Sequence, residues 1–339
     1  MGPKPSKKPI IITGFPYAFP YYFRVFEYLK NKEDFILVLP KLWVIKGGKV
    51  KFKLEQKPGF ITHGLQADYH GGHSIRGLFK GWMPGLIFLL PYLKIKYKSR
   101  VLYSCSEPQL LATLYNGIIA KILGFKHILF TWQNVSPDER MSGLKLKLSN
   151  AIVRLNLGLA DGIICGNKKA VEIIKRLAFS GQRLAVLICP ISGVDTEKFR
   201  PRITSDWREK LGIRPEEKLI LFYGALDKRK GLNVLIQALS LLNAKRSTLN
   251  ASLVIVGTGP EEESLKLQVQ SLKLQDKVIF LDWLPNDRLP ALLSVADVFV
   301  YPSVPFGGWE EQFGYAMAEA SACAVPVVAS RTGSIDEVV

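Results

Sequence analysis

The chain has 339 residues, of which 48% are hydrophobic and 22% are charged. This length accommodates two domains of ordinary size, and this composition excludes a disordered protein. Residues 1–200 contain 31 Lys and Arg against 12 Asp and Glu, whereas residues 201–339 contain 15 against 17. A strongly basic first part beside a nearly neutral second part predicts two domains with different surroundings. The basic domain would face an anionic lipid surface, an acidic substrate or nucleic acid.

No segment of the sequence predicts a signal peptide or a membrane span. The leading residues MGPKPSKKP are polar and basic, and the apolar run that follows is too short for a signal sequence. The most apolar later stretch, residues 81–93, is shorter than the roughly 20 apolar residues that a bilayer core requires. We therefore expect a cytoplasmic protein, with peripheral attachment to the cytoplasmic face of the membrane as an extension of that expectation.

Short apolar runs alternate with helical patterns through the first 190 residues. The runs are continuous rather than alternating, which is typical of parallel strands covered on both faces. The predicted strands are 9–15, 34–40, 100–106, 127–134, 162–167 and 184–190, and the predicted helices are 21–30, 108–124, 144–160 and 170–178.

The segment ISGVDTEKFRP, residues 191–201, contains Gly193 and Pro201 and predicts a domain boundary. The α/β alternation then restarts, so we expect two Rossmann-like domains, 1–197 and 198–339, with ligands at the carboxyl ends of their strands. The second series predicts strands at 218–224, 251–259, 277–283, 297–303 and 326–330, and helices at 232–245, 261–274, 289–296 and 311–324.

The cysteines and histidines do not predict a metal site. The four cysteines stand singly, without C-x-x-C spacing, and are expected to be buried in a reducing compartment. His63, His70 and His73 fall within THGLQADYHGGHS, where no cysteine or carboxylate pair supports metal binding. The glycines of that segment favour a mobile loop instead.

Two glutamates, Glu311 and Glu319, flank the partly apolar segment QFGYAMA. A predicted strand ends just before them, and a helix is expected to begin near Gln312, Phe313 and Gly314. The free amides and the dipole of that helix terminus suit a phosphate, and a glycine there lets the backbone approach a ligand. Along a helix the two carboxylates would lie on about the same side, roughly 12 Å apart. They could therefore bind hydroxyls on two parts of one extended molecule.

A cluster of cations, Lys228, Arg229 and Lys230, follows the predicted strand 218–224. It lies in a strand-to-helix turn that Gly224 opens and Gly231 closes. Each feature taken alone has an ordinary explanation, such as a charge near a helix end or a solvated turn. Cations for a diphosphate and carboxylates for sugar hydroxyls at one sheet edge together predict a nucleotide-sugar site.

Four segments of the second part of the chain resemble the nucleotide-binding half of family 4 retaining glycosyltransferases, which have the GT-B fold. These segments are GALDKRKG, VIVGTGP, VYPS and EQFGYAMAEASACAVPVVAS. The two glutamates match that family's E-x7-E motif, and GVDTEKFRP is similar to its interdomain linker. The resemblance is dense over 191–339, looser over 100–170 and weak before that. It implies an α/β protein with two facing Rossmann-like domains and parallel sheets, the first binding an acceptor and the second a nucleotide sugar. It also implies a hexosyltransferase that moves a sugar from a UDP- or GDP-sugar with retention and without a required metal.

The resemblance implies roles for individual residues. Glu311 would contact the hydroxyls of the donor sugar and stabilise developing positive charge, and Glu319 would bind the ribose. Lys230 would bind the diphosphate. Arg229 would supply the charge that the family usually carries at the position of Ala225. Gln312, Phe313 and Gly314 would provide amides for the phosphates.

Four more positions are implied at the ends of other strands. The nucleotide base would lie near Trp283 and Leu284. Gln133 and Asn134, in the FTWQN segment, stand where many relatives carry a histidine near the donor sugar, and we expect a polar contact there.

The segment KGWMPGLIFLLPYLKIKYKSR, residues 80–100, combines aromatic residues with lysines. This combination suits a membrane interface facing anionic lipid, and the alternative is a core helix with a charged last turn. The basic charge favours a glycan or lipid-linked acceptor, as in cell-envelope polysaccharide or glycolipid synthesis. No recognition helix or aromatic platform indicates a nucleic-acid partner.

Two competing interpretations remain open on the sequence. A nucleotide-sugar epimerase has the same fold and would convert the donor without an acceptor. The chain also ends at GSIDEVV, where the resembled family continues through a strand and helices. The resemblance therefore implies an incomplete C-terminal domain, and a non-catalytic fragment is the third interpretation.

Overall fold

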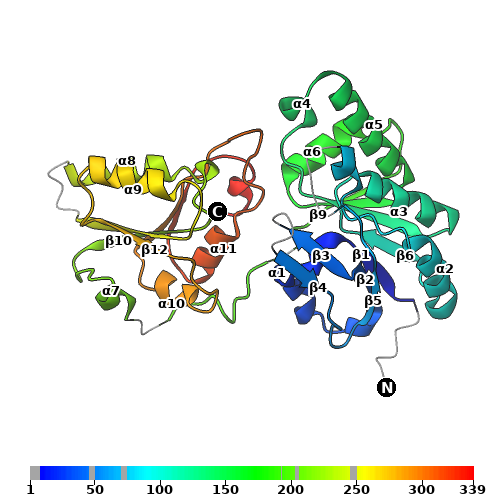
Figure 1. Cartoon of the computed structure of the whole chain (residues 1–339), viewed down its shortest axis with the longest axis horizontal. Helices are drawn as coiled ribbons and strands as arrows, with labels where there is room; N and C mark the ends of the chain where they lie inside the picture. Colours follow the sequence, from blue (N-terminus) through cyan, green and yellow to red (C-terminus); the bar gives the residue numbers. More distant parts are fainter. Residues whose placement is uncertain (1–7, 46–49, 70–74, 192, 203–205, 245–249) are drawn as a thin grey trace. The chain divides into compact units, whose positions relative to one another are not determined.

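A computed structural model describes residues 8–45, 50–69, 75–191, 193–202, 206–244 and 250–339. The chain divides into two compact units, Met1–Ser192 (unit 1) and Gly193–Val339 (unit 2), which are described separately (Figure 1). The division falls a few residues before the boundary predicted at 197/198. Phe199 is buried in the core of unit 2 and Val194 packs against that core, so the segment before the predicted boundary also belongs to unit 2.

Unit 1 is built on a seven-stranded, entirely parallel sheet with the order β5-β2-β1-β6-β7-β8-β9. The strand order reverses at β1, which pairs with both β2 and β6, so the carboxyl ends of β1 and β6 form a topological switch point. The strands are β1 Ile10–Thr13, β2 Phe35–Pro40, β5 Ile61–Leu65, β6 Val101–Ser104, β7 Lys126–Thr131, β8 Gly162–Cys165 and β9 Ala185–Ile188.

Helices α2, α3, α5 and α6 of unit 1 cover the sheet through apolar residues at helical spacing. On α2, for example, Leu86, Leu90 and Leu93 are buried and pack with residues of α3 and of β1, β2 and β6. The helices of unit 1 are α1 Pro20–Phe23, α2 Leu86–Tyr97, α3 Leu111–Ile122, α4 Pro137–Arg140, α5 Gly143–Leu159 and α6 Lys168–Leu177.

Several features of unit 1 differ from the sequence prediction. The helix predicted at 21–30 is only the short α1, followed by a 3-10 helix over Arg24–Tyr28. Its buried Phe23 and Phe26 are three residues apart, a spacing that a 3-10 turn aligns on one side. An antiparallel hairpin, β3 Leu42–Ile45 with β4 Val50–Lys53, was not predicted.

The loop expected around the three clustered histidines is wrong for His63. That residue lies in β5, paired with Val38 of β2. Burial lowers its pKa, with a smaller contribution from the charge of Lys96. His70 and His73 lie outside the described residues.

The cysteines are buried as expected at Cys105, Cys165 and Cys323, but Cys189 is exposed. Cys189 follows β9, whose residues are all exposed at the edge of the sheet. The expectation of four buried cysteines is therefore wrong at this edge.

Unit 2 contains a five-stranded parallel sheet with the order β12-β11-β10-β13-β14. Every strand predicted for this part of the chain is confirmed, and every residue of β11 is buried. The strands are β10 Lys218–Tyr223, β11 Ala251–Val256, β12 Val278–Leu281, β13 Val298–Tyr301 and β14 Val327–Ala329.

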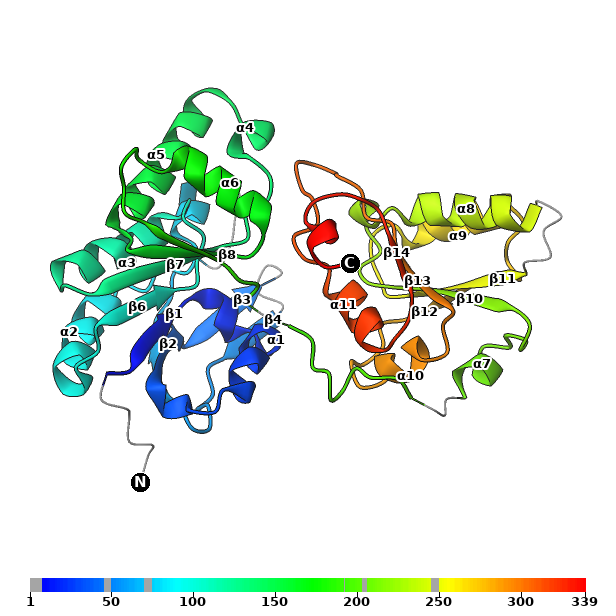
Figure 2. The same cartoon turned by 180° about the vertical axis from the view of Figure 1, so that it is seen from behind.

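The helices of unit 2 lie on both faces of its sheet. Figures 1 and 2 show α8 and α9 on one face and α10 and α11 on the other. The helix predicted at 311–324 begins only at Tyr315, because Gly314 has φ 80° and adopts a left-handed conformation. The bounds are α7 Trp207–Lys210, α8 Leu232–Ala244, α9 Glu262–Ser271, α10 Leu289–Leu293 and α11 Tyr315–Ala322.

Buried His127 on β7 is expected to make the stability of the protein depend on pH. Its Nε2 lies 3.0 Å from Ser104 Oγ, and burial lowers its pKa from 6.5 to about 4. Above pH 6.5 the side chain is neutral in both states, but between pH 6.5 and 4 the unfolded chain binds the proton more strongly. The free energy of unfolding should therefore fall by about 3 kcal/mol as the pH falls through this window.

The measurement is urea unfolding of the parent and of His127→Gln at pH 7.5 and at pH 4. The difference between these two pH values should be about 3 kcal/mol smaller in the variant. Parallel pH dependence of the two proteins would contradict the assignment of this effect to His127.

Candidate functional site

A buried ion pair joins Lys230 to Glu311. Lys230 Nζ donates to Glu311 Oε2 at 2.6 Å and also donates to the hydroxyl of Tyr301. The Tyr301 hydroxyl in turn donates to the same Glu311 oxygen at 2.7 Å. Lys230 is 8% exposed and Glu311 7% exposed. We call these three residues the Lys–Tyr–Glu triad; it brings together two residues that the sequence predicted and one that it did not.

Tyr301 takes part in the triad as a hydrogen-bond donor. Burial raises its pKa, and the adjacent carboxylate of Glu311 raises it further. The phenol therefore stays protonated, and its proton points to the glutamate. Lys230 and Tyr301 each donate to the Glu311 carboxylate, so both residues stabilise its negative charge. The ammonium of Lys230 also donates to the phenol oxygen of Tyr301.

The turn after β10 positions Lys230. The Asp227 side chain accepts from Arg229 N at 3.0 Å and caps the single 3-10 turn Lys228–Lys230. Gly231 ends this turn with φ 60°, and a Cβ there would lie 2.0 Å from the carbonyl oxygen of Pro302. Only glycine therefore allows this turn to pack against the segment after β13. Val304 N donates to Arg229 O at 2.8 Å and completes the connection.

Glu311 is held by its backbone as well as by its side chain. Ser334 N donates to Glu311 O at 2.9 Å. Gly333 has φ 60°, and a Cβ on it would lie 2.1 Å from the same oxygen. Glu311 therefore lies in a loop that the segment after β14 supports. The predicted helical relation between Glu311 and Glu319 is wrong, because α11 starts after Glu311.

Glu319 lies in α11, as the sequence indicated, and accepts a hydrogen bond from Tyr223. The hydroxyl of Tyr223, the last residue of β10, donates to Glu319 Oε2 and lies 3.2 Å from the carbonyl oxygen of Ala316. Tyr301 ends β13, the neighbour of β10 in the sheet. Two adjacent strands thus each end in a tyrosine that donates to one glutamate of the E-x7-E motif.

Arg229 lies against an aromatic ring that was not among the predicted site residues. Its Cζ is 4.0 Å from the centroid of the Trp309 ring, and its Nη2 lies 2.6 Å from Asp227 Oδ2. Lys230 Nζ is 5.4 Å from the same ring. The sequence contains one signal for this contact, the tryptophan in the loop VPFGGWE directly before Glu311. A large apolar side chain in a loop would be exposed unless it packed against a neighbour such as Arg229.

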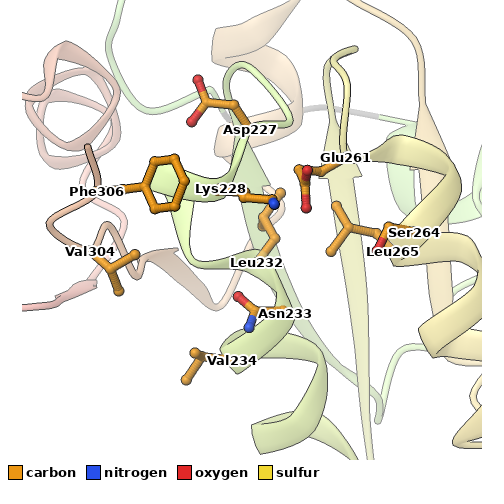
Figure 3. Close-up of a pocket in the computed structure, with 10 residues that line it drawn as sticks. All are labelled: Asp227, Lys228, Leu232, Asn233, Val234, Glu261, Ser264, Leu265, Val304 and Phe306. Carbon is orange, nitrogen blue, oxygen red and sulfur yellow. The ribbon is translucent and has the colours of Figure 1, made fainter. Parts of the chain in front are cut away.

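Lys228, the third cation of the turn, borders a separate pocket of about 380 Å³ (Figure 3). Figure 3 shows Phe306 and Val304 on one side of it and Glu261 and Leu265 on the other. Lys230, Tyr301 and Glu311 are not among its lining residues, so it is distinct from the triad. The lining residues are Asp227, Lys228, Leu232, Asn233, Val234, Glu261, Ser264, Leu265, Val304 and Phe306.

The predicted glycines serve close backbone packing. Gly224 follows β10, and a Cβ on Gly257 would lie 1.9 Å from its carbonyl oxygen. Leu226 N also donates to Thr258 O at 3.0 Å, so the turns after β10 and β11 support each other. Gly314 precedes α11, and a Cβ there would meet the Met317 side chain at 2.3 Å.

The other predicted residues of unit 2 lie in the segments before α11 and after β12. Gln312 and Phe313 are half-buried before α11, and the Phe313 ring lies 4.7 Å from that of Tyr315. Trp283 and Leu284 follow β12, where the Trp283 side chain is exposed and Leu284 packs on the core. The predicted binding of the donor's phosphates by backbone amides remains a prediction, and so does the predicted contact with the nucleotide base.

Gln133 and Asn134 belong to unit 1, where they follow β7 and are buried. Gln133 N donates to Thr131 Oγ1 at 3.1 Å, and its Nε2 lies 3.4 Å from Val135 O. Their predicted contact with a donor sugar stays a prediction. Over the part of the chain that the structure describes, no group of three or more His, Cys, Asp or Glu side chains is arranged to hold a metal ion.

The part of the chain that carries the triad is similar to known proteins. Residues 204–339 match the family described as "Glycosyl transferases group 1". A GDP-mannose-dependent alpha-(1-6)-phosphatidylinositol monomannoside mannosyltransferase of Mycolicibacterium smegmatis is 39% identical over 153 residues, covering 43% of this chain and 39% of that enzyme. A 2-deoxystreptamine N-acetyl-D-glucosaminyltransferase of Streptomyces fradiae is 22% identical over 267 residues, covering 78% of this chain and 62% of that enzyme. The chain thus spans less than two thirds of either relative.

Solved structures show the same fold. The chain is similar to Anabaena HepE in complex with UDP, with a TM-score of 0.70 at 18% identity over 98% of this chain and 83% of that one. Sucrose-phosphate synthase from Thermosynechococcus elongatus gives a TM-score of 0.65 at 19% identity, over 97% of this chain and 83% of that one. The predicted α/β fold with parallel sheets, as in GT-B glycosyltransferases, is confirmed.

Proposed function

From the match of residues 204–339 to the family described as "Glycosyl transferases group 1", we propose that the chain transfers a sugar from a UDP- or GDP-sugar to an acceptor, with retention of configuration. The observation that carries this proposal is the Lys–Tyr–Glu triad. Burying an ammonium and a carboxylate is costly, so such a pair in loops that follow two strands calls for a reason beyond stability. The triad lies at the carboxyl ends of β10 and β13, where open α/β sheets bind their ligands.

The triad can serve both halves of a nucleotide-sugar donor. An ammonium has three N–H donors, and Lys230 uses two of them on Tyr301 and Glu311. The third can bind the diphosphate and stabilise its charge as the sugar–oxygen bond breaks. Glu311 would accept from the hydroxyls of the donor sugar. Arg229 would add positive charge to the diphosphate site.

Glu319 and the start of α11 extend this arrangement. α11 begins at Tyr315, and its first amides present the positive end of a helix dipole to a phosphate. Glu319, one turn further along, would accept from the ribose hydroxyls. In this proposal unit 2 binds the nucleotide sugar and unit 1 binds the acceptor.

The names of similar proteins support particular substrates. One relative is described as GDP-mannose-dependent and as acting on a phosphatidylinositol monomannoside, and the HepE structure contains UDP. We therefore propose a hexosyl donor and a glycan or lipid-linked acceptor, with a role in cell-envelope polysaccharide or glycolipid synthesis.

The test incubates the full chain with UDP-glucose, UDP-N-acetylglucosamine and GDP-mannose, with and without simple glycoside acceptors. Release of nucleoside diphosphate and a product with the donor's anomeric configuration are expected with at least one donor. Conversion of a donor to an isomer without acceptor would establish the epimerase instead. No binding and no turnover of any of the three would overturn the proposal.

We also propose that unit 1 attaches to an anionic membrane, on its cytoplasmic face, through α2 and α3. These helices lie side by side in Figures 1 and 2 and share a core. Phe88 and Ile95 on α2 are each 81% exposed, and Ile122 on α3 is 77% exposed. Exposed lysines, among them Lys96 and Lys121, flank these apolar side chains. Apolar anchors with cations around them suit an anionic lipid surface.

No helix in the described parts of the chain is long and apolar enough to cross a bilayer. The proposed attachment therefore depends on side chains that insert at the interface. Replacing both Phe88 and Ile95 with Ser should lower binding to phosphatidylglycerol-containing vesicles by tenfold or more. The measurement is co-sedimentation at low and high salt, and binding of the parent should weaken with salt.

The matched control is Leu241→Ser, since Leu241 is 65% exposed on α8 of unit 2. Its binding should equal that of the parent. Equal loss in the two variants, or equal binding of the parent to neutral vesicles, would contradict attachment through α2 and α3.

A further inference from the structure

Unit 1 contains a pocket of about 460 Å³ beside the carboxyl ends of β1, β6 and β7. Its lining residues come from chain segments as distant as Phe15 and Ile191, and all of them belong to unit 1. The walls are rich in aromatic rings, and the polar members include Lys80 and Glu107. Phe15, Phe19, Tyr22, Trp43, Phe130 and Trp132 supply the rings.

The rings of this pocket are fixed by contacts with one another. Phe15 stacks on Trp43 with the ring centroids 4.8 Å apart. Trp132 meets Phe130 edge-on at 5.5 Å. The faces of aromatic rings carry partial negative charge and attract positively polarised C–H groups. Such walls suit the flat side of a ring that presents C–H groups rather than hydroxyls.

Glu107 provides a fixed acceptor on the same wall. Its Oε2 accepts from Thr131 Oγ1 at 2.6 Å, and its Oε1 accepts from Trp132 N at 3.0 Å. A carboxylate has about four lone-pair positions, so each oxygen can accept once more. Burial raises the pKa of Glu107, and its hydrogen bonds with Thr131 and Trp132 act in the opposite direction. A ligand hydroxyl would supply a further hydrogen bond.

Lys80 provides a cation for which the described residues supply no ion-pair partner. Its Nζ lies 4.5 Å from the centroid of the Phe15 ring, and among the described residues no carboxylate forms an ion pair with it. The side chain is half-buried, and this burial lowers its pKa. A partly desolvated ammonium beside a pocket is stabilised when an anion binds there.

We propose that this pocket binds a hydroxylated ring that carries an anionic group, with the ring against the aromatic walls, a hydroxyl on Glu107 and the anion on Lys80. The inference rests on the proposed function, because such a ring would be the acceptor of the transferred sugar. It narrows the acceptor to an acidic or phosphorylated sugar or cyclitol.

The test measures binding to the full chain by calorimetry, at constant ionic strength and without any donor. The probes are glucose 6-phosphate, glucuronate, glucose and inorganic phosphate. The two anionic sugars should bind at least about tenfold more tightly than glucose, as expected for a charge-assisted contact. They should also bind more tightly than inorganic phosphate, because the phosphate alone lacks a ring.

Two variants and a matched control locate the effect. Lys80→Gln should remove the preference for anionic sugars, whereas Lys80→Arg should keep it. The control is Lys57→Gln, because Lys57 Nζ also lies 4.5 Å from a ring centroid, that of Phe23, and does not line the pocket. Glu107→Gln should weaken glucose 6-phosphate and glucuronate by a similar factor.

The outcomes separate this inference from the proposed function. Equal binding of glucose and the anionic sugars, or equal loss in Lys80→Gln and Lys57→Gln, would overturn the assignment of the pocket. Turnover of a nucleotide sugar in those circumstances would leave the glycosyltransferase proposal standing. Selective binding through Lys80 without any turnover would instead retain the pocket and remove the proposed reaction.

Discussion

Lys230→Met is expected to lower the free energy of unfolding by about 3 to 5 kcal/mol, a range typical of broken buried ion pairs. Glu311 would stay buried among the same neighbours but would lose the ammonium at 2.6 Å. The hydroxyl of Tyr301 would remain as a donor, but it carries no charge. Urea unfolding followed by tryptophan fluorescence measures the loss, since Trp309 lies beside Lys230.

Two further chains show whether the loss comes from the uncompensated carboxylate. The double variant Lys230→Met/Glu311→Gln should recover most of the stability, because both charges are then absent. Lys228→Met removes a neighbouring positive charge that has no carboxylate partner among the described residues, and it should change stability by less than about 0.5 kcal/mol. A loss in Lys228→Met equal to that in Lys230→Met would contradict the explanation.

Glu311→Gln is expected to reduce turnover of the nucleotide sugar by roughly 100- to 1000-fold, the usual effect of removing one preorganised electrostatic group. The amide has nearly the shape of the carboxylate but cannot stabilise positive charge that develops on the sugar. It can still accept from Tyr301. The measurement is the rate of nucleoside diphosphate release at saturating donor, made after unfolding experiments have shown that the variant is folded.

Two other glutamates serve as comparisons. Glu310→Gln makes the same chemical change one residue earlier and should leave turnover within about twofold of the parent. Glu319→Gln should mainly raise KM for the donor, because contact with the ribose would be made equally before and during the reaction. If Glu311→Gln turns over donor at the parental rate, Glu311 has no part in the chemistry.

Much of the fold could be predicted from the sequence because parallel strands buried on both faces are continuous apolar runs. The segment ASLVIV of β11 is the clearest case, since all six of its residues are buried. The hairpin β3–β4 was missed although the sequence has two glycines between two short apolar runs, a pattern that favours a turn. The residues of β4 alternate between half-buried and exposed, and in a short segment such alternation is a weaker signal than a continuous apolar run.

The charged members of the candidate site could be predicted, but its aromatic members could not. Lys230 and Glu311 stand out as charges at the ends of apolar strands. Tyr301, Tyr223 and Trp309 look like ordinary core or loop residues in a sequence, and only the three-dimensional contacts reveal them as partners.

The position of Glu311 relative to Glu319 could not be predicted from the sequence for a different reason. Helical spacing applies only within one helix, and the left-handed Gly314 separates the two residues. The pocket of unit 1 was also not predictable, since Lys80 and Glu107 belong to segments that only the folded sheet brings together.

The three consecutive positive charges of the turn Lys228–Lys230 lie in three different environments. Lys228 borders the pocket of Figure 3, Arg229 covers Trp309 and Lys230 reaches Glu311. Since Gly231 packs closely against the backbone of Pro302, the turn has no room to accommodate a change in length. Insertion or deletion of a single residue here would shift each cation into its neighbour's place, so this loop should tolerate exchange of residues far better than any change in their number.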